Sequence, residues 1–225
     1  MVSKINVDTI LTIKNTQCKD AINFLINQTL EDIAKYSAGV IHTSDDGFSK
    51  NLSYIYEPKG RTEGLAGKKL KEKLDEIVFK MLEKNSLLPN SNKDNIRLTP
   101  WYLFKYSKEQ YIIPHADGSS TSNDGWKQTA AVSIQIKNAE CGGEFYTITD
   151  SFVDDYDTNT NVRFGLDKTS SKYNYDIYPK WILEDIGIGD VIVFGTNIVH
   201  GTKAVLEGEA IKAISFLEVN TNVRK

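Results

Sequence analysis

The stretch "IIPHADGSS" (112–120) places His115 and Asp117 one residue apart in a chain that has only three histidines. The preceding residues are apolar and read as a short strand, and residues i and i+2 of a strand point to the same side. The pair can therefore offer an imidazole and a carboxylate to one metal ion. It can equally be two ordinary polar residues at a loop.

A third metal ligand has to come from elsewhere in the chain. His42 lies in "VIHTSDD", and His200 follows an apolar strand and turn in "GDVIVFGTNIVHG". Two histidines and one carboxylate on one face of a metal leave three coordination positions open, which suits non-haem Fe(II). The pattern alone is weak evidence, because such combinations arise by chance and each histidine can be a hydrogen-bonded structural residue.

Lys212 lies in "AIKAISFLEV" (210–219), which reads as a strand with apolar residues on both faces. A buried ammonium costs several kcal/mol unless an anion pairs with it. Lys212 follows His200 by twelve residues, on what should be the neighbouring strand. The anion could thus belong to a ligand that chelates the metal, such as a dicarboxylate. In the alternative interpretation, Lys212 lies at a strand edge and extends to water.

Composition narrows the class of protein. The 225 residues can bury a sizeable core, and 40% hydrophobic with 25% charged residues is typical of globular proteins. The net charge of −3 argues against nucleic acid as a partner, and no apolar run is long enough to span a membrane. The opening "MVSKINVDTILTI" is not typical of a secretory signal. Cys18 and Cys141 are too few for a disulfide framework, so we expect two reduced thiols in a cytoplasmic protein.

The first part of the chain mixes strands and helices. We expect strands at 5–13 and 52–58, a glycine-rich loop at 59–67, and helices at 15–36 and 68–85. The first helix should begin at Asn15 or Thr16. Its expected apolar positions are Ala21, Ile22, Phe24, Leu25, Leu30 and Ile33. The second helix has one apolar stripe made of Leu70, Leu74, Ile77, Val78, Met81 and Leu82.

From Arg97 onward the chain consists of short strand-like runs separated by Gly, Asp and Asn turns. Such spacing predicts an antiparallel sandwich or barrel. The runs are "RLTPWYLFKY", "QYIIPH", "TAAVSIQI", "GGEFYTI", "DVIVFG" and "AIKAISFLEV". The long polar segment 151–178 interrupts them, and it is either a lid over a site or a mobile insertion.

Several of these stretches together resemble the Fe(II)- and 2-oxoglutarate-dependent dioxygenases, specifically the prolyl 4-hydroxylase-like branch. "LFKYSKEQYIIPHAD" resembles the family's strand leading into its HxD motif, and "AVSIQIKNAECGGEF" its strand, turn and GGE motif. "IGIGDVIVFGTNIVHGTKAVLEGEAIKAISF" resembles its closing strand, distal histidine, glycine and basic residue. Upstream, "VDTILTIKNTQCKDAINFL" and "GRTEGLAGKKLKEKLDEI" look like its opening strand–helix pair and arginine–threonine loop. The resemblance covers 5–219 loosely and 97–219 well.

The resemblance implies an α+β, mainly β fold, a double-stranded β-helix (jelly roll) supported by N-terminal helices. The whole chain, 1–225, would be one domain, with 1–96 as the supporting region and 97–219 as the core that carries the 151–178 insertion. His115, Asp117 and His200 would bind Fe(II). Lys212 would hold the distal carboxylate of 2-oxoglutarate, and Tyr106 would line that pocket or serve as a core aromatic. Gly142 and Gly143 would serve a tight turn.

Two departures from the family pattern affect these expectations. Lys212 lies slightly further from the histidine than usual, so Lys203 or Arg163 could replace it as the carboxylate-binding residue. The 151–178 segment is longer than the family minimum, which leaves the substrate open.

The implied activity is hydroxylation of an unactivated C–H bond, with O2 as second co-substrate and with release of succinate and CO2. Related halogenases have a small residue in place of the carboxylate, so Asp117 favours hydroxylation. The expected substrate is a prolyl residue of a protein or peptide, and a free amino acid is the alternative. Arg61 and Trp126 are candidate substrate contacts, although a surface arginine and a loop aromatic would look the same. A non-catalytic jelly-roll binding protein is the alternative from another class.

Overall fold

The computed structural model describes residues 10–13, 19–36, 40–41, 60–85, 93–148, 181–182 and 186–222. The strand predicted at 52–58 and the segment 151–178 lie outside these residues, as do Cys18, His42 and Arg163. Cys141 is a free, exposed cysteine. No helix among the described residues is long and apolar enough to cross a membrane.

The described strands form two antiparallel sheets and a small ribbon. The larger sheet has the order β1 (Ile10–Ile13), β11 (Val191–Gly195), β7 (Trp126–Lys137), β14 (Ala210–Asn220), β5 (Tyr102–Tyr106), β3 (Arg61–Leu65) and β2 (Val40–Ile41). An eighth strand, β4 (Ile96–Leu98), follows the 3₁₀ turn Lys93–Asn95 and also pairs with β14. The smaller sheet has the order β10 (Trp181–Ile182), β9 (Phe145–Ile148), β12 (Val199–Thr202) and β6 (Ile112–His115). The ribbon pairs β13 (Val205–Glu207) with β8 (Cys141–Gly142).

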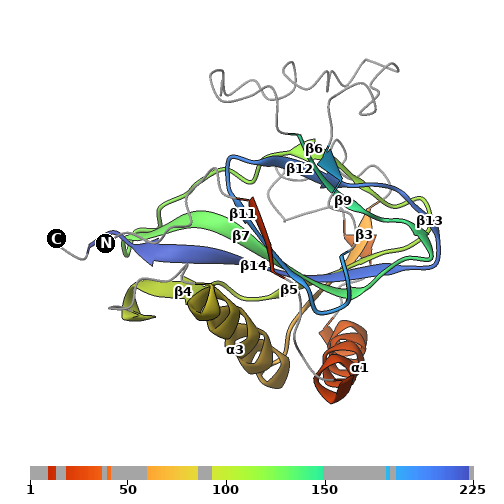
Figure 1. Cartoon of the computed structure of the whole chain (residues 1–225), viewed down its shortest axis with the longest axis horizontal. Coiled ribbons are helices and arrows are strands. Elements are labelled where there is room, and N and C mark those ends of the chain that lie inside the picture. Colours follow the sequence, from red (N-terminus) through yellow and green to blue (C-terminus); the bar gives the residue numbers. More distant parts are fainter. Residues whose placement is uncertain are drawn as a thin grey trace.

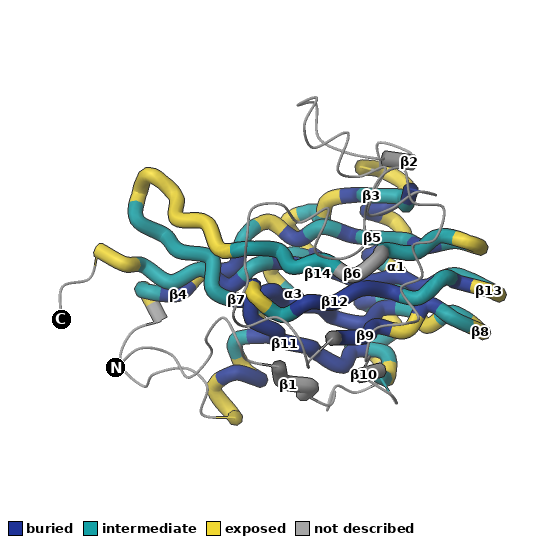
Figure 2. The backbone as a smooth tube through the Cα atoms, turned by 90° about the horizontal axis from the view of Figure 1, so that it is seen from above, coloured by how far each residue is buried: buried dark blue, intermediate teal, exposed yellow. Residues whose placement is uncertain are grey.

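The two sheets lie face to face and enclose an interior between them (Figure 1). This arrangement is the jelly roll that the sequence predicted. β11 and β12, one from each sheet, are buried along their whole length (Figure 2).

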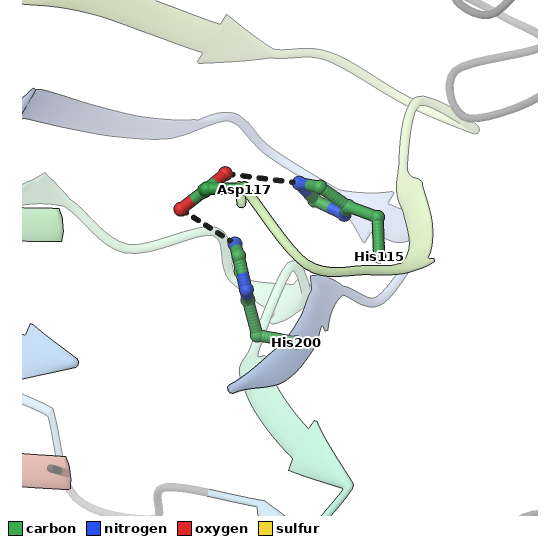
Figure 3. Close-up of side chains that lie close together, drawn as sticks. All are labelled: His115, Asp117 and His200. Atoms are coloured by element: carbon green, nitrogen blue, oxygen red, sulfur yellow. Dashed lines mark ion pairs between the residues drawn. The ribbon is translucent and has the colours of Figure 1, made fainter. Parts of the chain in front are cut away.

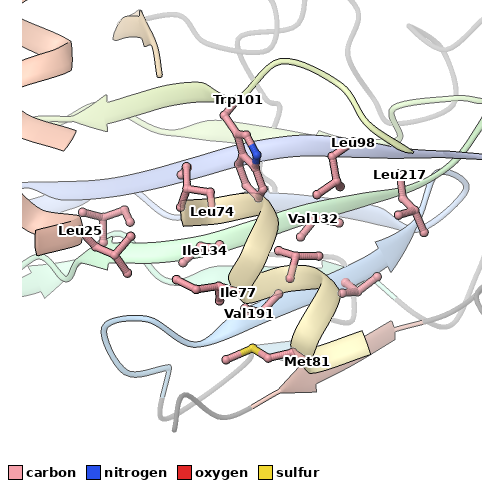
Figure 4. Close-up of a cluster of buried hydrophobic side chains, with 14 of the residues drawn as sticks. Leu25, Leu74, Ile77, Met81, Leu98, Trp101, Val132, Ile134, Val191 and Leu217 are labelled. Atoms are coloured by element: carbon pink, nitrogen blue, oxygen red, sulfur yellow. The ribbon is translucent and has the colours of Figure 1, made fainter. Parts of the chain in front are cut away.

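Two helices cover the outer face of the larger sheet. α1 (Lys19–Tyr36) and α3 (Lys68–Lys84) lie on the side opposite to β6, β9 and β12 (Figure 1). The buried residues of α3 are the six of the predicted apolar stripe. They pack against the outward-facing side chains of the sheet, which include Trp101, Val132, Ile134, Val191 and Leu217 (Figure 4).

Hydrogen bonds fix the helices to each other and to the sheet. Asp32 of α1 accepts a 2.7 Å bond from the backbone N–H of Gly67, the residue before α3. This carboxylate thus satisfies a backbone donor at the start of α3, where helices lack internal acceptors. On α3, Asp75 accepts a 2.7 Å bond from the indole N–H of buried Trp101.

The apolar face predicted for α1 is wrong at one position. Leu30 is 43% exposed, whereas Leu25, Thr29, Asp32 and Ile33 are buried. Thr29, Asp32 and Ile33 lie four, seven and eight residues after Leu25, and these spacings define one face of a helix. Leu30 falls off that face. The tie to Gly67 explains why Asp32 occupies this face instead of an apolar residue.

The glycine-rich loop predicted at 59–67 is also wrong, because Arg61–Leu65 form strand β3. β3 pairs with β5 from Thr62↔Lys105 to Leu65↔Tyr102, and its other edge pairs with β2. The backbone hydrogen bonds to β5 outweigh the low strand propensity of Gly64, which is buried in the sheet.

Truncating a buried side chain in this helix–sheet layer tests the packing. Leu74 is fully buried, and Leu74→Ala should lower the free energy of unfolding by about 2–5 kcal/mol, because it removes apolar contacts and leaves a cavity. Leu206→Ala is the matched control, since Leu206 is 59% exposed and should change stability by less than about 0.5 kcal/mol. Urea denaturation measures both. Equal effects of the two substitutions would contradict this packing.

Candidate metal and co-substrate site

His115, Asp117 and His200 come together at one edge of the interior. β6 ends at His115, and the register of β12 with β6 pairs His200 directly with His115. Asp117 follows two residues later, and its neighbour Gly118 donates a 3.0 Å backbone hydrogen bond to Thr196. One ligand atom from each of the three residues lies within 4.8 Å of the others (Figure 3).

His200 presents a free nitrogen lone pair to this cluster. Its Nδ1 lies 3.0 Å from the carbonyl oxygen of Ile198. Because a carbonyl only accepts hydrogen bonds, Nδ1 carries the proton and Nε2 carries the lone pair. Burial lowers the pKa of His200 to about 4, and the nearby Lys212 charge contributes in the same direction, so the ring is neutral at physiological pH. A neutral imidazole fixed through its other nitrogen is the usual state of a metal ligand.

Asp117 lies between the two imidazoles, within ion-pair distance of both. Its Oδ1 is 3.7 Å from His115 Nε2, and its Oδ2 is 3.9 Å from His200 Nε2. Both distances exceed those of hydrogen bonds. The side chains of His115 and Asp117 are each only 16% exposed, and burial raises the pKa of Asp117, an effect that His115 partly offsets. A cation between these three atoms would stabilise the buried carboxylate in its charged form.

Lys212 is buried in the same interior, as the sequence predicted. It is 2% exposed, and its Nζ donates a 2.9 Å hydrogen bond to Thr202 Oγ1. Its Nζ also lies 5.8 Å and 5.6 Å from the ring centroids of Tyr106 and Phe145. Within the described part of the chain no carboxylate forms an ion pair with Lys212. Burial therefore lowers the pKa of Lys212 to about 7, although the charge of Glu144 opposes the shift.

The expected position of Lys212 relative to His200 needs one correction. Lys212 does not lie on a strand next to that of His200, because β14 belongs to the larger sheet and β12 to the smaller one. The two strands face each other, and Lys212 reaches across the interior to Thr202 of β12. A ligand between them would therefore contact both sheets.

The other candidates for the pocket differ in burial. Tyr106 is 2% exposed and pairs with Ala210 in the sheet, so its side chain lies on the same face as that of Lys212. Lys203 is half-buried and follows the last residue of β12. Lys212 is the buried cation of the two.

The candidate substrate contacts lie in different surroundings. The Arg61 guanidinium stacks 3.8 Å above the Phe104 ring and forms a 3.0 Å ion pair with Glu63. Because Glu63, Phe104 and Lys212 are successive partners across three strands, Arg61 shares the inner face of the sheet with Lys212.

Trp126 lies near the far end of the sheet. Its ring stacks 4.4 Å from the Arg97 guanidinium, which forms ion pairs with Asp124 and Glu218. Trp126 pairs with Asn220, eight residues along β14 from Lys212, or roughly 26 Å. Arg61 thus lies much closer to Lys212 than Trp126 does.

Several solved structures have a fold similar to that of this chain. No protein-family model matches the sequence, and no curated protein matches it. A viral collagen prolyl hydroxylase from Paramecium bursaria Chlorella virus-1, solved in complex with 2-oxoglutarate, has 15% identity and a TM-score of 0.54 over 93% of this chain and 96% of that one. A prolyl hydroxylase from Trichoplax adhaerens, in complex with a hypoxia-inducible-factor peptide, has 13% identity and a TM-score of 0.58 (92% and 82% covered). A non-heme α-ketoglutarate-dependent carbocyclase from nogalamycin biosynthesis has 12% identity and a TM-score of 0.61 (95% and 80% covered).

The chain has the fold of the non-heme 2-oxoglutarate oxygenases.

Some residues at the candidate site were not predicted from the sequence. Thr202, the hydrogen-bond partner of Lys212, is one, although its position two residues after His200 places both side chains on one face of β12. Phe145 and Phe194 are others, with ring centroids 5.5 Å and 4.4 Å from that of His200. Only the tertiary structure shows that these rings enclose the histidine.

Three glycines near the site are required by geometry. Gly142 and Gly143 have φ angles of 78° and 75°, and a Cβ on Gly142 would lie 2.1 Å from the Ala204 carbonyl oxygen. The positive φ angles and the close approach to the Ala204 backbone explain why glycine occupies these positions, although Gly142 lies in strand β8 and not in the predicted tight turn. Gly201, beside His200, is needed for another reason, because its Cβ would lie 2.4 Å from Tyr146 Oη and 2.7 Å from the Ile112 carbonyl oxygen.

Gly201→Ala tests the close packing of β6, β9 and β12. The added methyl group would force apart the strands that carry the two histidines, so we expect a loss of at least about 1–3 kcal/mol in unfolding free energy. Gly187→Ala is the control, because its Cβ would meet its nearest neighbour, Asp190 Oδ2, at an ordinary 3.5 Å. Denaturant melts of both variants give the comparison. A fully stable Gly201→Ala protein would show that this contact does not constrain the site.

Proposed function

We propose that this chain is an Fe(II)- and 2-oxoglutarate-dependent oxygenase that hydroxylates a prolyl residue of a protein or peptide. One observation carries the proposal. Two imidazoles and a carboxylate converge within 4.8 Å at one end of the interior, and a buried ammonium without an ion-pair partner among the described residues lies further inside. The first feature suits a metal, and the second suits the free end of an anionic ligand of that metal.

The donor set fits Fe(II). Two imidazole nitrogens and one carboxylate oxygen form the 2-His-1-carboxylate set that leaves open positions on non-haem iron. His115, Asp117 and His200 are therefore the residues that would hold the metal.

The spacing along β12 supports 2-oxoglutarate as the second ligand. Thr202, which holds Lys212, and His200 lie two residues apart on one face of the strand, or about 6.6–6.8 Å. An extended five-carbon dicarboxylate spans about 5 Å between its carboxyl carbons and roughly 7 Å between its outer oxygens. One carboxylate can thus reach Lys212 and Thr202 while the other end reaches the metal.

When bound, iron with 2-oxoglutarate and O2 supplies the oxidising power for inserting oxygen into a C–H bond. The protein's part is to bind, orient and exclude water. Lys212 and Thr202 would fix the distal carboxylate, and the Phe145 and Phe194 rings beside His200 keep water away from that side of the site. Exclusion of water strengthens every charge interaction in the site.

The prolyl substrate is supported by the fold comparison and by the inner face of the larger sheet. Two of the similar structures are prolyl hydroxylases, one of them in complex with a peptide. Arg61 and Glu63 lie on the inner face, with side chains 17% and 23% exposed, and could contact polar groups of a peptide backbone.

A direct assay tests the proposal. The protein is incubated with Fe(II), 2-oxoglutarate and O2, together with proline-rich peptides or, separately, with free amino acids. Succinate release and the gain of one oxygen atom in peptide mass are measured. Oxidation of peptides supports the proposal, and oxidation of free amino acids alone would replace the substrate class. Absence of succinate in every mixture would favour a non-catalytic binding protein.

Removing either histidine should abolish metal binding. His115→Ala or His200→Ala should weaken Mn(II) or Fe(II) binding by more than about 100-fold, since a lost ligand matters more than a lost outer partner, which already costs 10–100-fold. His42→Ala, at the chain's third histidine, is the control and should bind metal like the wild type. Anaerobic calorimetry measures the affinities. If both site variants still bind the metal with wild-type affinity, the three residues are not its ligands.

The pKa of Lys212 predicts a pH dependence of co-substrate binding. The ammonium form binds the anion, and with a pKa of about 7 this form predominates only below that pH. Above pH 7 binding requires uptake of a proton, so the Kd for 2-oxoglutarate should rise about tenfold per pH unit.

Lys212→Met provides the control for this pH effect. The variant should bind 2-oxoglutarate weakly and lose the pH dependence, whereas its metal affinity should stay near that of the wild type. Calorimetry in buffers of different ionisation enthalpy detects proton uptake in the wild type at pH 8. A wild-type Kd that stays constant from pH 7 to 9 would show that Lys212 does not bind the anion.

A further inference from the structure

The inner face of the smaller sheet carries a row of side chains whose order follows from strand register. β9 pairs with β12 so that Phe145 faces Thr202 and Thr147 faces His200. Directly opposed residues of antiparallel strands point to the same side, with Cβ atoms about 4.5–5.5 Å apart. Thr147 therefore shares the inner face with His200, in the same way as Phe145 shares it with Thr202.

The Thr147 hydroxyl is buried and has no partner. Its side chain is fully buried, and its Oγ1 forms no hydrogen bond within the described part of the chain. Buried hydroxyl groups in proteins are nearly always hydrogen-bonded, because leaving one unpaired is unfavourable. A valine would fill the same volume without that penalty. The buried hydroxyl therefore indicates a hydrogen-bond partner that the described residues do not provide, such as a ligand.

The position of Thr147 indicates which part of a ligand it would meet. With the distal carboxylate of the co-substrate on Lys212 and Thr202, the other end lies about 6.6–6.8 Å along the strand, level with His200. Thr147 is opposite His200 at that level. The group within its reach is then an anionic oxygen of the co-substrate beside the metal.

We infer that the Thr147 hydroxyl donates a hydrogen bond to the metal-side carboxylate of 2-oxoglutarate, an inference that rests on the proposed function. A hydroxyl donor to a carboxylate forms a short, charge-assisted bond, which is stronger than a bond between neutral groups. Thr147 then complements Lys212 and Thr202, because it holds the metal-side end of the co-substrate while they hold the distal end. In the ligand-free protein its hydroxyl is instead a source of instability.

Thr147→Val should preserve or raise the stability of the ligand-free protein but weaken its binding of 2-oxoglutarate. The ligand-free variant should melt at the same temperature as the wild type or higher, because an unpaired buried hydroxyl becomes a methyl group. Its Kd for 2-oxoglutarate, measured by anaerobic calorimetry on the Mn(II)-loaded protein, should rise about tenfold. Its Mn(II) affinity should not change, since Thr147 is not a proposed metal ligand. Thr147→Ser keeps the hydroxyl and should bind within about threefold of the wild type.

Thr29→Val is the matched control. Thr29 in α1 is also fully buried with an unpartnered hydroxyl, but it lies in the helix layer outside the sheet. Its replacement should raise or preserve the melting temperature and leave the 2-oxoglutarate Kd unchanged. A change in melting temperature alone is therefore not evidence for ligand contact.

The outcomes separate this inference from the proposed function. If the wild type binds Mn(II) and 2-oxoglutarate but Thr147→Val binds both equally well, the role of Thr147 is overturned and the proposed function stands. If the wild type binds no 2-oxoglutarate, the proposed function fails and this inference fails with it. Thr147→Ala is a second hydroxyl-free variant, so the result does not depend on how valine packs.

Discussion

The pairing of β12 between β6 and β9 is the constraint on which the candidate site depends. This pairing brings His200 opposite His115 on one side and opposite Thr147 on the other. Because side chains alternate along a strand, a shift of one residue would turn His200 and Thr202 away from the interior together. Close packing around Gly201 opposes such a shift, since Tyr146 and the Ile112 carbonyl fill the space beside it.

The second constraint is the low polarity of the space between the sheets. The same burial keeps His200 neutral, raises the pKa of Asp117 and brings the pKa of Lys212 to about 7. If these three groups were exposed to water, their pKa values would lie close to the ordinary values of their side chains. Between the sheets, each is poised to bind a charged ligand, because pairing with that ligand removes a penalty that the protein alone cannot remove.

Sequence patterns predicted the features that depend on local periodicity. The stripe of α3 and the burial of Lys212 follow from spacings of 3.6 and two residues, and both are found. Features that depend on tertiary context were missed. β3 forms because it pairs with β5. Asp32 occupies the buried face of α1, where Leu30 was expected, because it accepts a hydrogen bond from the backbone N–H of Gly67 before α3.

The relation between Lys212 and His200 shows the same limit. Their sequence positions suggested neighbouring strands, but the two strands lie in different sheets. The pattern of residues along one strand shows which side chains share a face of the sheet. It does not show which strand of the other sheet that face will meet. The contact between Lys212 and Thr202 could only be found in three dimensions.

The register of His115 with His200 also bears on how the protein folds. The two residues are 85 positions apart in the sequence (200 − 115), so their encounter closes a long loop and requires both β6 and β12 to be in place. Contacts between residues so distant in sequence form slowly, and a collapsed but unpaired chain would hold its histidines apart. At the proposed site, a metal would therefore bind late in folding, after β6 and β12 have paired within the smaller sheet.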